Sequence, residues 1–102
     1  MIAILWTYRV KPECRVLFEA IYSPEGEWVQ LFQQAAGYRG AELLRQPEGR
    51  YATIDRWAQA GDFERFKERS RPAYEALDRR CEALTLEERF LGRFEVYPFK
   101  AG

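Results

Sequence analysis

The carboxylate of Asp55 is the side chain of this sequence best placed to act as a base. It falls in the segment 50–57, where alternating residue types predict a strand with Asp55 and Trp57 on one face. A carboxylate on an inward, apolar face loses hydration, so its pKa rises and it becomes a candidate general base. The alternative is an ion pair between Asp55 and a neighbouring arginine.

Two phenols complete the set of candidate catalytic residues. The hydroxyls of Tyr8 and Tyr74 could orient a bound phenol or quinone through hydrogen bonds. The alternative for each is a tyrosine whose hydroxyl has its hydrogen bonds satisfied at the surface.

Large aromatic residues are the candidate walls of a substrate cavity. The segment 50–57 ends on a tryptophan and turns directly into a helical pattern that opens with phenylalanines, so we expect a cavity at that junction. The candidate substrate-binding residues are Trp6, Trp28, Trp57, Phe63 and Phe66. The alternative is that these rings only form the hydrophobic core.

Histidine is absent from the sequence, and this excludes several kinds of site. Ser-His-Asp and Cys-His catalysis, His-ligated zinc and His-ligated haem all require it. Cys14 and Cys81 are too few and too far apart for a thiolate metal site. We therefore expect no metal and no cofactor. Both cysteines should lie at the same end of two antiparallel helices, where a bridge is conceivable, but cytosolic thiols are normally reduced.

Composition sets the class of protein. A chain of 102 residues suits a single domain, residues 1–102. Sixteen basic residues balance sixteen acidic ones, so we expect neither nucleic acid nor an anionic membrane as a partner. No apolar run approaches the roughly 20 residues of a bilayer span, and no signal segment opens the sequence. We expect a cytoplasmic protein.

The hydrophobic pattern alternates between strand and helix periods along the chain. It predicts strands at 2–10, 38–46, 50–57 and 86–97, and helices at 12–37 and 62–84. In the first helix, Leu17, Ala20 and Ile21 should face inward, and Gly37 should end it in a left-handed conformation. The helix should also be interrupted at Ser23–Gly26, with Ser23 as a cap and Pro24 as a restart.

Three further positions should shape the later elements. The residues Pro47 to Gly49 predict a hairpin turn. Pro72 should kink the second helix near Ser70. In the last strand, Phe90, Phe94 and Val96 should share a face, with Gly92 as a candidate bulge.

The resulting order β-α-β-β-α-β is that of the ferredoxin-like α+β fold. Right-handed crossovers give a four-stranded antiparallel sheet in the order 4-1-3-2 with both helices on one face. The other face carries Ala3, Leu5, Ala52 and Ile54, and it is too apolar to meet water. A second copy of the chain would cover it, so we expect a homodimer.

Short signals along most of the chain agree with one known family. They are Gly26-Glu27-Trp28, Leu31-Phe32, Gly37-Tyr38, Glu42-Leu43-Leu44-Arg45, Arg50-Tyr51, Ile54-Asp55-Arg56-Trp57, and Phe63 with Phe66-Lys67. In these residues, and over roughly residues 2 to 96, the chain resembles the antibiotic biosynthesis monooxygenases, which are dimeric α+β barrels.

The resemblance carries over residue by residue. Trp57 matches the tryptophan that closes the third strand of the family and often lines its pocket. In haem-degrading relatives a histidine stands where this chain has Phe66, and an asparagine stands where it has Trp6, so the resemblance disfavours haem degradation. The Asn, His and Arg groups of the quinol oxidisers have no clear set of equivalents, although Arg56 and Tyr74 could substitute in part.

Two functions follow from these residues. The first is a cofactor-independent monooxygenase that orients a small quinol-like or phenol-like substrate, with Asp55 as the base. The second is a non-catalytic dimeric module that binds a small apolar ligand or a partner. A cavity with no proton-accepting group within reach of a bound ligand would favour the second function.

Overall fold

The computed structural model describes residues 1–100 and has the element order that the sequence predicts. The elements are β1 (Ile2–Val10), η1 (Pro12–Cys14), α1 (Arg15–Tyr22), α2 (Glu27–Phe32), β2 (Tyr38–Gln46), β3 (Arg50–Trp57), α3 (Asp62–Arg69), α4 (Arg71–Glu82) and β4 (Thr85–Glu95). The last strand therefore spans 85–95 instead of 86–97.

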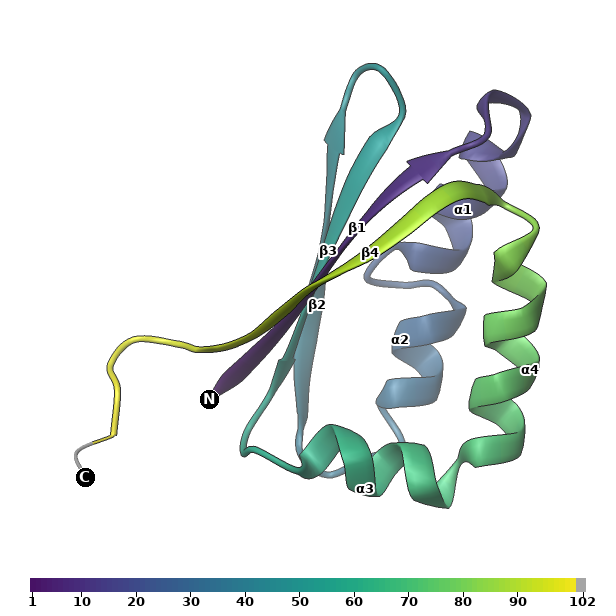
Figure 1. Ribbon diagram of the computed structural model, residues 1–102. Helices are drawn as coiled ribbons and strands as arrows, with labels where there is room; N and C mark the ends of the chain where they lie inside the picture. Colours follow the sequence, from purple (N-terminus) through teal and green to yellow (C-terminus); the bar gives the residue numbers. More distant parts are fainter. Residues whose placement is uncertain (101–102) are drawn as a thin grey trace.

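The strands form one antiparallel sheet in the order β2-β3-β1-β4, which confirms the predicted topology. All the helices lie on one side of this sheet and the other side is left open (Figure 1). In the register between β1 and β3, Ile4 pairs with Asp55, Trp6 with Thr53 and Tyr8 with Tyr51. Because side chains alternate across a strand, these pairs all point toward the helices.

A bulge in β4 corrects one prediction. The register between β1 and β4 shifts between Leu5 and Trp6, next to Gly92, which adopts a φ of 141°. The extra residue reverses the alternation, so Phe90 packs against Trp6 on the helix side, with tilted rings whose centroids are 5.2 Å apart. Phe94 instead pairs with Ala3 on the open side. The bulge at Gly92 was predicted correctly, but Phe90 and Phe94 do not share a face.

The inward face of the first helix also differs from the prediction. Phe18 is fully buried together with Ile21 and Tyr22, whereas Leu17 is 54% exposed and Ala20 is exposed. Residues 12–14 form a turn of 3₁₀ helix, which winds more tightly than an α-helix. The predicted and observed faces both follow helical spacing one residue apart, and the observed one buries the large Phe18 ring against other aromatic rings.

Gly37 is needed for a close approach and not for a left-handed conformation. Residues with positive φ within 1–100 are Gly40, Gly49, Gly61 and Gly92. A Cβ at Gly37 would lie only 2.2 Å from a carboxylate oxygen of Asp62, where α3 begins. The predicted left-handed cap at this position is therefore wrong. Pro24 does not restart the helix either, because α2 begins at Glu27.

The predicted break near Ser70 is confirmed. Helix α3 ends at Arg69 and α4 begins at Arg71, with Pro72 in its first turn, where a missing backbone N–H costs no hydrogen bond. The break lets α3 run from the end of the sheet past the end of α2, and lets α4 return alongside α2 (Figure 1). This change of direction closes one end of the space between the sheet and the helices.

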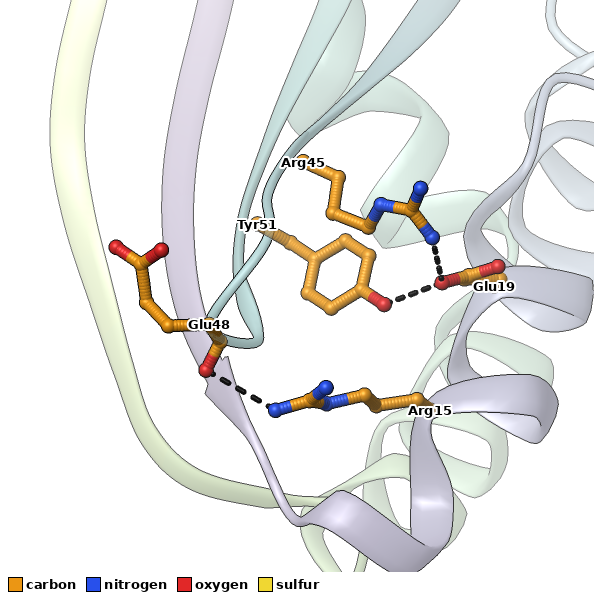
Figure 2. A network of polar contacts seen from close by, with 5 residues as sticks. All are labelled: Arg15, Glu19, Arg45, Glu48 and Tyr51. Atoms are coloured by element: carbon orange, nitrogen blue, oxygen red, sulfur yellow. Dashed lines mark hydrogen bonds and ion pairs between the residues drawn. The ribbon is translucent and has the colours of Figure 1, made fainter.

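Polar contacts hold the β2–β3 hairpin against α1 (Figure 2). The hydroxyl of Tyr51 donates a hydrogen bond to Glu19, and Arg45 forms an ion pair with the same carboxylate at 3.3 Å. Arg15 donates to the backbone oxygen of Glu48 at 3.0 Å. Gly49, with a φ of 92°, makes room for the Arg15 guanidinium. The hairpin is thereby fixed beside the first helix.

Candidate functional site

A cavity of about 250 Å³ lies between the sheet and the helices. Its floor consists of helix-facing residues of β1 and β3, namely Ile4, Trp6, Tyr8, Thr53, Asp55 and Trp57. Its upper wall comes mainly from α2, α3 and α4, through Trp28, Phe32, Phe63 and Tyr74. The alternation of two strands and the inward stripes of three helices therefore converge on one space.

Asp55 lies in this cavity without a charged partner. Within residues 1–100 its carboxylate forms no ion pair and no hydrogen bond, and burial raises its pKa from 3.8 to about 7. The neighbouring Arg56 points to the open side of the sheet, where it pairs with Glu42 at 2.6 Å. The alternative of an Asp55–arginine pair is therefore not realised, and the group remains available to accept a proton near neutral pH.

Tyr8 and Tyr74 reach the same cavity as neutral phenols. The Tyr8 hydroxyl lies 3.3 Å from the Thr53 hydroxyl, and burial raises the pKa of Tyr8 far above its ordinary value. Burial also raises the pKa of Tyr74 to about 12, with the charges of Asp78 and Glu88 contributing. At neutral pH both phenols keep their protons, so they can orient a ligand but cannot act as bases.

Aromatic rings surround Trp57, which is only 1% exposed. Its ring lies within 6 Å of those of Phe32, Tyr38, Phe63 and Phe66. The indole N–H of Trp57 has no hydrogen-bond acceptor within residues 1–100. Trp57 is thus both a core residue and part of the cavity wall, so the two interpretations of this residue are not exclusive.

The structure brings seven of the eight predicted site residues to the cavity surface. These are Asp55, Tyr8, Tyr74, Trp6, Trp28, Trp57 and Phe63. Phe66 is different, because it is buried behind the wall, against Phe32 and Trp57, and does not line the cavity. It supports the site from outside.

The sequence analysis did not identify three charged residues that line the cavity. Lys67, Asp78 and Glu88 line it together with Asp55, and the Lys67 ammonium lies 4.9 Å from the centre of the Tyr74 ring. The sequence does indicate the position of Asp78, because this residue follows Tyr74 by four positions and so lies on the same face of the helix. Glu88 required knowledge of the β1–β4 register, in which it pairs with Tyr8.

The described residues offer no metal site. Between residues 1 and 100, no group of three or more Cys, Asp or Glu side chains is arranged to hold a metal ion. Cys14 and Cys81 are free thiols. None of the helices in this part of the chain has the length and hydrophobicity needed to span a bilayer.

Solved structures share this architecture. A variant of SnoaB, a cofactor-independent oxygenase from Streptomyces nogalater, superposes with a TM-score of 0.71 at 17% identity, covering 96% of this chain and 94% of its own. A candidate antibiotic biosynthesis monooxygenase from Nitrosomonas europaea gives a TM-score of 0.71 at 12% identity, covering 95% of this chain and 99% of its own. The chain has the antibiotic biosynthesis monooxygenase fold.

The same fold also accommodates a different ligand. A variant of MhuD with two manganese protoporphyrin IX molecules bound per active site gives a TM-score of 0.73 at 19% identity, with both chains covered completely. In sequence, the chain matches no family model and no curated protein. The fold is therefore established by structure, and the function has to be argued from the site.

Proposed function

We propose that the protein is a cofactor-independent monooxygenase that oxidises a small phenolic or quinol-like substrate. The observation that supports this most directly is Asp55, an unpaired carboxylate in an aromatic cavity, with its pKa raised to about 7. A base with this pKa is suited to remove a phenolic proton at neutral pH. Oxygenases without a cofactor are found among the structural neighbours, which is consistent with the proposal.

The chemistry needs no external reductant. A phenol O–H donates its proton to the Asp55 carboxylate, and the resulting electron-rich phenolate transfers electrons to O₂. One oxygen atom forms a bond to the ring carbon opposite the hydroxyl, and the other leaves as water with the hydrogen of that carbon and the phenolic hydrogen. The products are a quinone and water, so atoms and electrons balance. The protein orients the ring, excludes water and holds the proton.

Oxygen uptake on a panel of phenols and quinols tests the proposal. Substrate-dependent consumption of one O₂ per phenol, with formation of a quinone in the absence of added metal or flavin, is the expected result. Ligand binding without oxygen uptake across the panel would contradict it. That outcome would favour the non-catalytic binding module instead.

We also propose that the active form is a homodimer joined through the open side of the sheet. Leu5 and Ile54 lie there beside Leu44 and Phe94, which are about half exposed in the single chain. Such a surface favours association through burial of apolar area. The face opposite the helices would then be covered by the same face of a second copy.

The Ile54→Glu variant should be monomeric at micromolar concentration. The dimer would have to bury an unpaired carboxylate, which would weaken the free energy of association by about several kcal/mol. Light scattering or analytical ultracentrifugation gives the measurement. Leu17→Glu is the matched control, because Leu17 is exposed on α1 away from this face. A wild-type monomer, or an Ile54→Glu dimer, would contradict the proposal.

Haem should not bind at a defined site. The residues at the cavity do not fit it, because the chain has no histidine and the position of the iron ligand in haem-degrading relatives is matched by Phe66, which is buried behind the wall. Adding haem should give no saturable Soret band at one site per subunit. A saturable band that disappears on replacing Tyr74 or Cys81 would overturn this prediction.

A further inference from the structure

The ionisable side chains of the cavity are predominantly acidic. Three carboxylates, those of Asp55, Asp78 and Glu88, line it, against one ammonium group, that of Lys67. None of the four forms an ion pair within residues 1–100. The balanced charge of the whole sequence is therefore not reproduced at this site.

Two of these carboxylates, Asp78 and Glu88, interact electrostatically at the cavity. Asp78 is one helical turn beyond Tyr74 on α4, and Glu88 lies beside Tyr8 on β4. The pKa of Glu88 is raised by burial first and then by the negative charge of Asp78 and Glu82. A cation placed between Asp78 and Glu88 would relieve this repulsion.

The cavity walls also favour a cation. Trp6, Trp28 and Tyr74 contribute aromatic rings, and the faces of such rings attract positive charge. Lys67 already uses the Tyr74 ring in this way, at 4.9 Å from its centre. The excess of unpaired carboxylates over ammonium groups and the aromatic walls are two independent observations that point to the same class of ligand.

We infer that the substrate is an aromatic molecule that carries a basic nitrogen, with its hydroxyl directed at Asp55 and its ammonium group between Asp78 and Glu88. Asp55 and Glu88 are two strands and four residues apart, which separates their Cα atoms by roughly 16 Å. Both side chains line the cavity, so an elongated ligand can contact both. This inference rests on the proposed function, because it takes the same cavity as the substrate site.

Three probes with one ring system and different charges test it. Serotonin carries an ammonium group, hydroxyindole is neutral and hydroxyindoleacetate is an anion. Calorimetric titration at low ionic strength should show serotonin binding about tenfold or more tightly than hydroxyindoleacetate, with hydroxyindole between them. Added salt should narrow the difference.

Variants show whether the two acidic residues cause this preference. Combining Asp78→Asn with Glu88→Gln should bring the serotonin and hydroxyindoleacetate affinities close to each other. Glu87→Gln is the matched control, because this residue is the neighbour of Glu88 but lines the opposite side of the sheet with Arg9. It should leave the preference unchanged.

The outcomes separate this inference from the proposed function. Equal affinities for the three probes, or a preference for the anion, would overturn the inference and leave the cavity as an aromatic-binding site. Failure of all three probes to bind would overturn the inference and also count against the cavity as the substrate site.

Discussion

Replacing Asp55 by asparagine should strongly reduce oxygen consumption and, above pH 7, make the protein more stable. Both effects follow from one property, because burial raises the pKa of this carboxyl from 3.8 to about 7 and no cationic partner offsets it. An amide of the same shape fills the same space but neither accepts a proton nor carries a charge. We expect turnover to fall by about a hundredfold or more.

The sign of the stability effect can be worked out from the pKa. In the folded protein Asp55 holds its proton up to about pH 7, whereas in the unfolded chain it loses it near pH 4. Between these values the folded state binds more protons, so stability falls as the pH rises through this window. The full cost, on the order of a few kcal/mol, is present above pH 7. The Asn variant avoids this cost.

Thermal unfolding measured from pH 4 to pH 8 checks the prediction. The melting temperatures of wild type and Asp55→Asn should be similar at pH 4, and the variant should melt about 5 °C or more higher at pH 8. Glu25→Gln is the control, since it removes an exposed carboxylate in the loop between α1 and α2, away from the cavity, and leaves Asp55 in place. Retained oxygen uptake in Asp55→Asn, or an unchanged pH dependence of its stability, would contradict the assignment of Asp55 as the base.

The rate of oxygen consumption by the wild type should follow the ionisation of Asp55. Only the ionised carboxylate can accept the substrate proton, so the rate should rise with pH and level off above about 7. Stability and activity therefore change in opposite directions over one pH range. A protein selected only for stability would not keep an unpaired carboxylate at this position.

The strands could be predicted from the sequence because alternation defines their faces directly. Asp55 and Trp57 were assigned to one face of β3 from residue types alone, and the register with β1 places them there. The face of α1 could not be predicted in the same way. Two sets of residues one position apart both follow helical spacing, and only packing against the aromatic rings of the sheet decides that Phe18 is buried and Leu17 exposed.

The apolar part of the site was predictable and its charged part was not. Large aromatic residues on inward faces are buried between the sheet and the helices, and Trp6, Trp28 and Phe63 line the cavity there as expected. Charged residues on a helix or an edge strand usually face water, and Glu88 is indeed exposed, but the sequence does not show that it also lines the cavity. Its position depends on the register between β1 and β4, which is a tertiary property.

Trp57 should contribute to both ligand binding and stability, and the two can be separated. The indole is 1% exposed and lines the cavity, so truncation to alanine should cost about 3–5 kcal/mol. A domain of this size has only about 5–15 kcal/mol in total, so Trp57→Ala would not distinguish a binding role from unfolding. Trp57→Phe is the better variant because it keeps most of the apolar area.

Trp57→Phe should lower the affinity for an aromatic ligand while lowering the melting temperature only modestly. It removes an indole N–H that has no acceptor within residues 1–100, which offsets part of the packing that is lost. Phe66→Leu is the matched control, since Phe66 packs against Trp57 but does not line the cavity. It should lose stability and keep ligand affinity. If Trp57→Phe instead melts early yet retains full binding and turnover, Trp57 is a core residue alone and the cavity does not use it.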